Sequence, residues 1–222
     1  MMSNSSYQRG FTLIEISMVI AIVALIMGGV MRGQELVTQA RIRDVINDLN
    51  GVAAAYNFYY DRYKAIPGDD VVAGTRWGPG AKSGGGNGAI SGKYFDHKDP
   101  SALNNDDNDE SSKFWWHLRL AGFIDGAGDG PAATAQPGNS VGGIVGVQTG
   151  GLGLSSLIVC ESSVPDKIAA AVDLNLDDQL PNSGVVRGYK QSSSNEDVTG
   201  KAPNVTVYEE TGTSQYVVCK MI

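Results

Sequence analysis

The chain has 222 residues, with 17 lysines and arginines against 24 aspartates and glutamates, which gives a net charge of −7. A surface that neutralises nucleic-acid phosphates needs clustered lysine and arginine, so this acidic balance argues against nucleic-acid binding as the main function. About 190 residues follow a single long apolar stretch, which is enough for one domain with its own hydrophobic core.

The apolar stretch runs from Phe11 to Met31 and holds Glu15 as its only ionisable side chain. As an α-helix it would extend roughly 32 Å, about the thickness of a bilayer's hydrocarbon core. Arg9 lies just before it, which indicates that the N-terminal end stays in the cytoplasm while the C-terminal part crosses the membrane. Taken alone, the stretch predicts an uncleaved single-pass anchor. An isolated carboxylate in lipid costs at least a few kcal/mol, so Glu15 requires a compensating partner.

Residues 10–15 read GFTLIE, and together with the apolar run after them they resemble the prepilin signature of type IV pilins and of the pseudopilins of type II secretion. The resemblance implies that a prepilin peptidase cleaves between Gly10 and Phe11 and that the new amine of Phe11 is N-methylated. It also implies that Glu15 pairs with the Phe11 amine of an adjacent subunit during assembly. The charges agree, because that amine would lie one helical turn from Glu15, and a helix N-terminus favours an anion in its first turn.

The resemblance divides the chain into three parts: a leader peptide (1–10), a transmembrane and filament-core helix (11–31), and residues 32–222, which continue the helix and form a globular pilin domain. Many type IV pilins carry a proline at the position of Arg32, where the helix unwinds locally in the filament. Here the sequence instead has glycines around that position, namely Gly28, Gly29 and Gly33. Glycine weakens a helix by about 1 kcal/mol relative to alanine, but it also allows close helix–helix approach. Local unwinding and close packing therefore both stay open.

Beyond Met31 the apolar residues recur every three or four positions. This spacing predicts that the helix continues with one buried face, made of Ile42, Val45, Leu49, Val52, Tyr56, Tyr60 and Tyr63. Pro67 and Gly68 mark its end, so that a single helix of about 50 residues is expected. The aromatic residues between 56 and 63 also suggest an electron path along a filament. Because aromatic side chains at helical spacing commonly pack in a core, we interpret them as core residues.

Two glycine-rich segments, 74–92 and 122–153, are predicted to be surface loops, because neither has the strand, helix and lysine of a phosphate-binding loop. Catalysis has little support. His97 and His117 are the only histidines, and no metal-ligand spacing or nucleophile motif accompanies them. His117 is interpreted as a packing residue. The sequence therefore predicts that the protein is not an enzyme.

Residues 111–122 predict a short helix that Ser111 or Ser112 caps at its start and Gly122 at its end. Its apolar face comprises Phe114, Trp115, Leu118 and Phe123. The adjacent pair Trp115 and Trp116 also suggests a sugar-binding platform, but packing is the favoured interpretation.

Five short segments rich in β-branched or aromatic residues are predicted to be strands: Val141–Val147, Ser156–Cys160, Val185–Tyr189, Val205–Tyr208 and Tyr216–Met221. Pro165–Val172 predicts another short helix with proline at its start. A long helix followed by consecutive short strands gives an α+β fold with an antiparallel sheet. That is also the pilin fold that the resemblance implies.

The two cysteines, Cys160 and Cys219, both lie in the C-terminal part of the chain. If that part is outside the cytoplasm, a disulfide between them is expected, and two buried free thiols are the alternative. Closing a loop of about 60 residues would restrict the unfolded chain by roughly 4 kcal/mol.

Oxygen ligands lie close together in the sequence at Asp173, Asn175, Asp177 and Asp178, as they do in calcium loops. The sixth and twelfth positions of an EF-hand would be Gly and Glu, whereas Asp178 and Gly184 occur here, so the segment is not an EF-hand. Some secretion pseudopilins bind calcium in C-terminal loops, which makes calcium a candidate cofactor by resemblance. The alternative is an acidic turn stabilised by its own backbone. The second acidic run, 104–110, is also a candidate for calcium, and the alternative is that it precedes the next helix and stabilises the N-terminus of that helix.

These patterns predict a structural filament subunit, made as a precursor in the bacterial inner membrane. The resemblance implies four partners: the prepilin peptidase, an inner-membrane assembly platform, the membrane before assembly, and further copies of the chain in a helical filament. The filament would be an extracellular pilus or a periplasmic pseudopilus, with Phe11–Met31 in its apolar centre. The alternatives are a type II secretion pseudopilin or minor pilin and, from another class, a membrane-anchored binding protein that does not polymerise. Adhesion, motility, DNA uptake and secretion are not distinguished.

Overall fold

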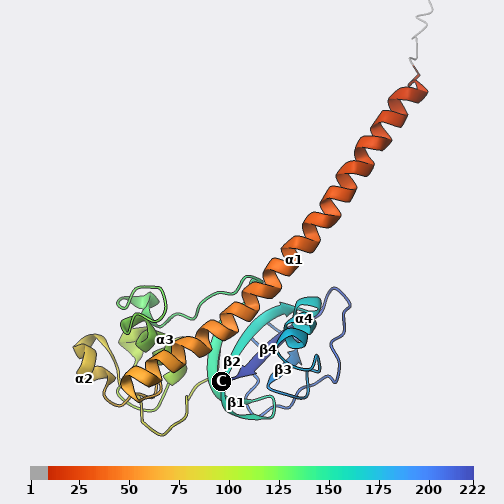
Figure 1. Cartoon of the computed structure of the whole chain (residues 1–222). Coiled ribbons are helices and arrows are strands. Elements are labelled where there is room, and N and C mark those ends of the chain that lie inside the picture. The colour runs from red at the N-terminus through yellow and green to blue at the C-terminus, as the bar shows by residue number, and fades with distance from the viewer. Residues whose placement is uncertain (1–9) are drawn as a thin grey trace, which may run out of the picture. The chain divides into compact units, whose positions relative to one another are not determined.

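The computed structural model describes residues 10–222, so Arg9 and the rest of the leader before Gly10 lie outside the described residues. One helix, α1, runs without interruption from Leu13 to Tyr63 (Figure 1). This confirms the prediction of a single long helix of about 50 residues. The chain divides into two compact units, Met1–Ala40 and Arg41–Ile222, and α1 contributes residues to both of them.

In the first unit, the part of α1 from Ile16 to Met31 carries no charged side chain and is apolar on every side. The large hydrophobic side chains from Phe11 to Met31 are all exposed in the single chain. Among the described residues, α1 is the helix that is long and apolar enough to cross a membrane. The helix continues through the glycines that the sequence singled out, Gly28, Gly29 and Gly33. A side chain added at any of these three glycines would meet no other atom within 4 Å.

The second unit contains a four-stranded antiparallel sheet with the strand order β1-β2-β4-β3. The strands are β1 (Val145–Gly151), β2 (Leu154–Pro165), β3 (Val186–Lys190) and β4 (Gln215–Met221). The helices are α2 (Ala73–Trp77), α3 (Glu110–Leu120) and α4 (Asp166–Leu176), besides short 3₁₀ turns at Gly78–Gly80, Pro100–Ala102 and Pro131–Thr134. The predicted α+β fold with an antiparallel sheet is confirmed.

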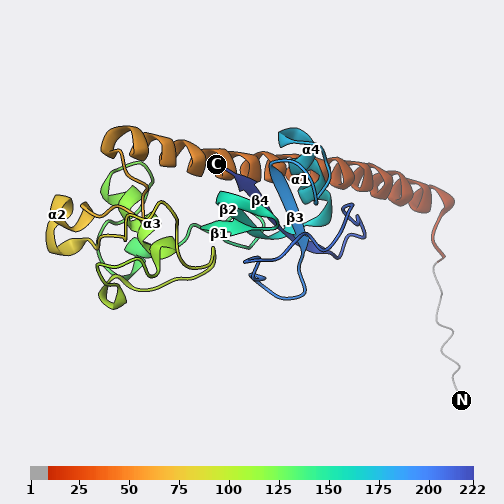
Figure 2. The same cartoon turned by 90° about the horizontal axis from the view of Figure 1, so that it is seen from below.

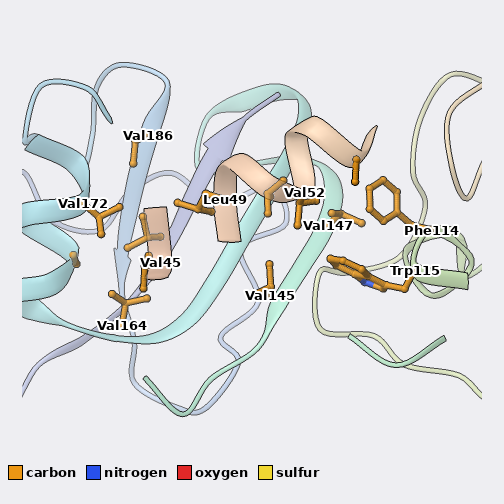
Figure 3. Packing of buried hydrophobic residues seen from close by; sticks show 14 of the residues in the cluster. Val45, Leu49, Val52, Phe114, Trp115, Val145, Val147, Val164, Val172 and Val186 are labelled. Atoms are coloured by element: carbon orange, nitrogen blue, oxygen red, sulfur yellow. The ribbon is translucent and has the colours of Figure 1, made fainter. Parts of the chain in front are cut away.

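The main hydrophobic core lies on one face of this sheet. The C-terminal part of α1 runs along that face (Figure 2), and α3 and α4 contribute to the same cluster. Figure 3 shows Val45, Leu49 and Val52 of α1 packed among side chains of the sheet, α3 and α4. Residues alternate along β2, so that Val159 belongs to this core while Cys160 belongs to a smaller cluster on the opposite face.

The buried stripe of α1 differs from the prediction at its aromatic end. Ile42, Val45, Leu49 and Val52 are buried as expected, but the stripe continues through Ala55 and Tyr59. Tyr60 is 45% exposed, so its assignment to the core was wrong, and Tyr56 and Tyr63 are only half-buried. From Val52, steps of three and four residues lead to Ala55 and then Tyr59. A small alanine marks the face as well as a tyrosine does, but it gives a weaker hydrophobic signal.

Helix α3 begins one residue before the predicted start, and neither Ser111 nor Ser112 caps it. Both serines lie buried inside the helix, and the Ser112 hydroxyl donates to the carbonyl of Asp96 at 3.2 Å. The predicted end is correct, since Gly122 follows the helix with a φ of +75°. Trp115 and Trp116 are both buried, which excludes an exposed sugar-binding platform built from them.

Four of the five predicted strands exist, with shifted ends. The first begins at Val145 instead of Val141, because residues 139–143 form a turn in which the Asn139 side chain accepts the N–H groups of Val141 and Gly143. The prediction at Val205–Tyr208 was wrong, since no strand forms there. Its Tyr208 instead packs against the core as a side chain and donates from its hydroxyl to Asp173 at 2.7 Å.

The glycine-rich segment 74–92 is also not simply a surface loop. Gly84 is buried, and the backbone N–H groups of Gly86, Asn87 and Gly88 all donate to the carboxylate of Asp69. The second segment, 122–153, holds the whole of β1 as well as loops. In both segments glycine permits close backbone packing, which composition alone does not distinguish from a flexible loop.

Candidate functional site

The N-terminal end of α1 carries the residues that the sequence analysis placed at the processing and assembly site. Gly10 and Phe11 precede the helix and lie outside regular secondary structure. Phe11 is 84% exposed, and no atom lies within 4 Å of the position of a side chain at Gly10. Among residues 10–222, nothing therefore packs over the peptide bond between these two residues, and cleavage at this bond stays a prediction.

Glu15 lies in the first turn of α1, where it closes a reciprocal cap with Thr12. The Thr12 N–H and hydroxyl donate to Oε2 of Glu15 at 2.8 and 2.9 Å, and the Glu15 N–H donates to the Thr12 hydroxyl at 3.3 Å. This is a capping box, in which the two side chains satisfy N–H groups that have no partner inside the helix. Glu15 thus has a structural role in the single chain besides the expected pairing with an amine.

The role of Thr12 was missed in the sequence analysis, although the signal was present. Thr12-x-x-Glu15 is the sequence pattern of a capping box directly before an apolar run. The pattern was overlooked because the glutamate was read only as a charge inside a membrane span.

Cys160 and Cys219 form a disulfide with a sequence separation of 59 residues. The two cysteines are directly paired residues of the neighbouring strands β2 and β4, and both are fully buried. The disulfide therefore joins the two central strands of the sheet from the face opposite α1.

The C-terminal end of α4 gathers three of the four residues proposed for calcium. Carboxylate oxygens of Asp173, Asp177 and Asp178 lie within 4.8 Å of one another. The side-chain amide of the fourth residue, Asn175, donates to the carbonyl of Ala171 at 2.6 Å.

All three carboxylates also accept hydrogen bonds from the protein. Asp177 accepts the N–H groups of Val185 and Val186, and Asp178 accepts the hydroxyl of Ser183 at 2.6 Å. Burial, followed by the nearby charges of Asp178 and Asp177, raises the pKa of Asp173 to about 6. These contacts tie the end of α4 to the start of β3, as expected for an acidic turn. Calcium binding stays a prediction.

The second acidic run is also engaged within the protein. The ammonium group of Lys113 lies 3.1 Å from Asp106, and that of Lys98 lies 2.7 Å from Asp109. The Glu110 carboxylate accepts the N–H groups of Gly85 and Ser91 at 2.8 and 3.0 Å. The run therefore connects α3 to the glycine-rich loop.

His117 lies in the core and is fully bonded. Its Nδ1 accepts the N–H of Gly68 at 2.9 Å, and its Nε2 lies 2.7 Å from the carbonyl oxygen of Lys82, to which it must donate. Burial lowers the pKa of His117 to about 4, so the ring is neutral at pH 7. This agrees with the interpretation of His117 as a packing residue.

Comparison with known proteins adds two findings. Residues 5–31 match the family described as the prokaryotic N-terminal methylation motif. Among solved structures, the chain is similar to the structure of the major type IV pilin PilA1 from Clostridium difficile, with a TM-score of 0.36 and 12% sequence identity over 82% of this chain and 96% of that chain. No curated protein matches the sequence. The motif at residues 5–31, followed by the long apolar helix, thus supports the resemblance of this chain to the family of pilins and pseudopilins.

Proposed function

We propose that this chain is a structural subunit of a type IV pilus filament, cleaved between Gly10 and Phe11 and polymerised through α1. The observation that carries the proposal is the methylation motif at the start of a helix whose apolar side chains are exposed on every side from Phe11 to Met31. Such a surface is stable only in lipid or against other apolar surfaces. The membrane would hold this helix first, and helices of neighbouring copies would then replace the lipid.

In this proposal, Glu15 fixes the register between neighbouring helices of the filament. Cleavage would convert the peptide nitrogen of Phe11 into an amine, which the resemblance pairs with Glu15 of a neighbour. A carboxylate and an amine that meet in an apolar environment attract strongly, and each is costly if its partner is missing. A mismatch in helix register would leave both groups unpaired, so the pair favours one assembly geometry.

The test is Glu15→Ala in cells that assemble the native protein. We expect normal cleavage at Gly10, measured by mass spectrometry of the mature chain, together with at least a tenfold loss of protein in sheared extracellular filaments. Glu35→Ala is the matched control, because Glu35 is an exposed acid on the same helix beyond the apolar stretch. If the native protein is absent from filaments and occurs in the membrane as a monomer, the filament proposal is wrong.

The same measurement separates the alternatives. A major pilin would be the main component of the sheared filaments, a minor pilin a trace component, and a type II secretion pseudopilin would stay in the periplasm. A membrane-anchored binding protein would not polymerise at all. Pilins and pseudopilins are structural rather than catalytic proteins, and a catalytic role is not part of the proposal.

A further inference from the structure

A groove of about 400 Å³ opens in the second unit beside the C-terminal part of α1. Asp48 and Val52 of α1 line one side, and Trp115, Phe123 and Asp125 line the other, while Val145 of β1 forms part of its floor. Figure 3 shows Val52, Trp115 and Val145, which come from three different elements of the same core. The groove thus combines an apolar, aromatic interior with two carboxylates.

The groove is strongly biased toward negative charge. Asp48 is half-buried and Asp125 is exposed, and neither forms an ion pair with any residue between 10 and 222. Burial and the nearby Asp44 raise the pKa of Asp48. The guanidinium of Arg119 lies nearby, but it donates to backbone carbonyls, including those of Asp125 and Ala133.

A third carboxyl group lies beneath the lining of the groove, next to Val145 and without access to the groove itself. Glu161 of β2 is the direct partner of Val145 across the β1–β2 ladder, so the two side chains lie on the same face of the sheet. Glu161 is fully buried, and neither of its carboxyl oxygens has a hydrogen-bond partner among the described residues. Burial and the charge of Asp48 raise its pKa to about 9.

On the wall opposite α1, Trp115 has a second polar group without a hydrogen-bond partner among residues 10–222. The indole N–H of Trp115 is buried and has no acceptor within the described part of the chain. Trp115 is fully buried and forms the base of this wall, whereas Phe123 is half-buried and its accessible surface is suited to contact with a cation or an alkyl chain. An anionic ligand would meet the two carboxylates of Asp48 and Asp125, and a purely apolar ligand would bury Asp48 without a partner, which is costly.

The geometry points to a lysine or arginine side chain of a second copy of this chain as the occupant of the groove. Such a side chain has an apolar stem for Val52 and Phe123 and a cationic head for Asp48 and Asp125. The second unit also offers the complementary charges. Arg41, Arg43 and Lys167 are exposed, and none of them forms an ion pair within residues 10–222. The inference rests on the proposed function, which brings many copies side by side.

The chemistry of the groove is tested on the full mature chain in detergent micelles. Nα-acetyl-lysine amide is titrated while the indole N–H signals are followed by NMR, with Trp115→Phe to assign the relevant signal. We expect a saturable shift of the Trp115 signal. Nα-acetyl-norleucine amide, which has a similar stem and no charge, should give no such shift.

The double variant Asp48→Asn/Asp125→Asn should bind the lysine amide about tenfold more weakly. Asp44→Asn, on the same helix outside the groove lining, should bind it as the native chain does. Equal shifts with both amides, or native affinity in the double variant, overturn the inference.

The identity of the occupant is tested in filaments. Asp48→Asn/Asp125→Asn should lower the filament yield severalfold relative to Asp44→Asn, with equal cleavage at Gly10. If the double variant loses affinity for lysine amide but forms filaments normally, the cation comes from solution, for example from a polyamine, and the second copy is wrong. If the native chain forms no filaments, the proposed function fails, and the inferred occupant fails with it, while the titration still reports separately on the groove.

Discussion

Among the described residues, Glu161 is the one whose carboxyl pKa lies furthest from its ordinary value. Its pKa rises to about 9, far above its ordinary value of 4.5, mainly because it is buried. Between these two values the folded protein holds a proton that the unfolded chain has released. Stability from this group is therefore fully present below pH 4.5 and is lost as the pH rises through 9, with a slope of up to about 1.4 kcal/mol per pH unit.

Glu161→Gln keeps the shape of the side chain but removes this titration. We expect the free energy of unfolding of the native chain to fall from pH 6.5 to pH 9, while that of the variant stays nearly flat. Measuring above pH 6.5 avoids most of the titration of Asp173, whose pKa is about 6 and which acts in the same direction at lower pH. Urea unfolding followed by tryptophan fluorescence provides the measurement. Parallel curves for the two proteins would contradict the prediction.

Asp70 holds the turn after α1 through a buried network. Its side chain accepts the hydroxyl of Tyr59 at 2.7 Å and the N–H of Val72 at 2.9 Å, and it forms an ion pair with Arg76. Burial opposes ionisation, but the hydrogen bonds from Arg76 and Tyr59 outweigh it and lower the pKa of Asp70. Asp70→Ala should cost about 3 kcal/mol of stability, because it leaves the buried hydroxyl of Tyr59 and the half-buried guanidinium of Arg76 without their carboxylate partner. Tyr59→Phe should cost only about 1 kcal/mol in the same denaturation assay, and an equal loss in both variants would contradict this account.

At the residue scale, the sequence identified residues with a local signature. Gly10, Phe11 and Glu15 lie within one local motif, the methylation motif at residues 5–31, although their roles in processing and assembly stay predictions. Glu161 was not recognised, because its burial depends on the register of β2 and on which face of the sheet α1 covers. Those are long-range properties, and a lone glutamate beside a cysteine gives no sign of them.

Among the structural elements, the glycine-rich loop allows the sharpest test. A Cβ added to Gly84 would lie 2.2 Å from the carbonyl oxygen of Gly68 and 2.4 Å from Cα of Asp69. Both are backbone atoms, so Gly84→Ala should shift the loop and cost about 2 kcal/mol or more. Gly80→Ala is the control, because its added Cβ meets nothing within 4 Å and should change stability by less than about 0.5 kcal/mol. Equal thermal melting of both variants would show that the loop is not packed in this way.

The elements themselves were predictable where the local pattern was strong. The length of α1 and four strands followed from periodicity, β-branched residues and turn signals. The segment Val205–Tyr208 has the composition of a strand, but it lies outside the sheet and its side chains serve core packing instead. Ser111 is a residue type that commonly caps helices, but here it lies inside a helix whose first turn is buried. In both cases tertiary packing overrode a local preference.

For the whole molecule, replacing the glycines in the first half of α1 should test assembly without disturbing the fold of the single chain. Because Cβ atoms at Gly28, Gly29 and Gly33 meet nothing in the single chain, replacing all three by alanine should leave the monomer folded and strengthen the helix. If neighbouring helices approach closely there, the triple variant should form several times fewer filaments. Gly51→Ala, at another open position on α1, is the control. Unchanged filament yield in the triple variant would argue against close packing at these glycines.

The disulfide limits how far the chain can extend under tension. Cys160 and Cys219 close a covalent ring that contains α4 and β3. A force applied between α1 and the C-terminal residue passes through the disulfide and bypasses the chain between the cysteines, which are 59 positions apart. At about 3.5 Å per residue, roughly 200 Å of chain is thereby withheld from stretching. Single-molecule pulling should therefore release that additional length only after the disulfide is reduced, so that oxidation sets the greatest extension that the chain can reach under load.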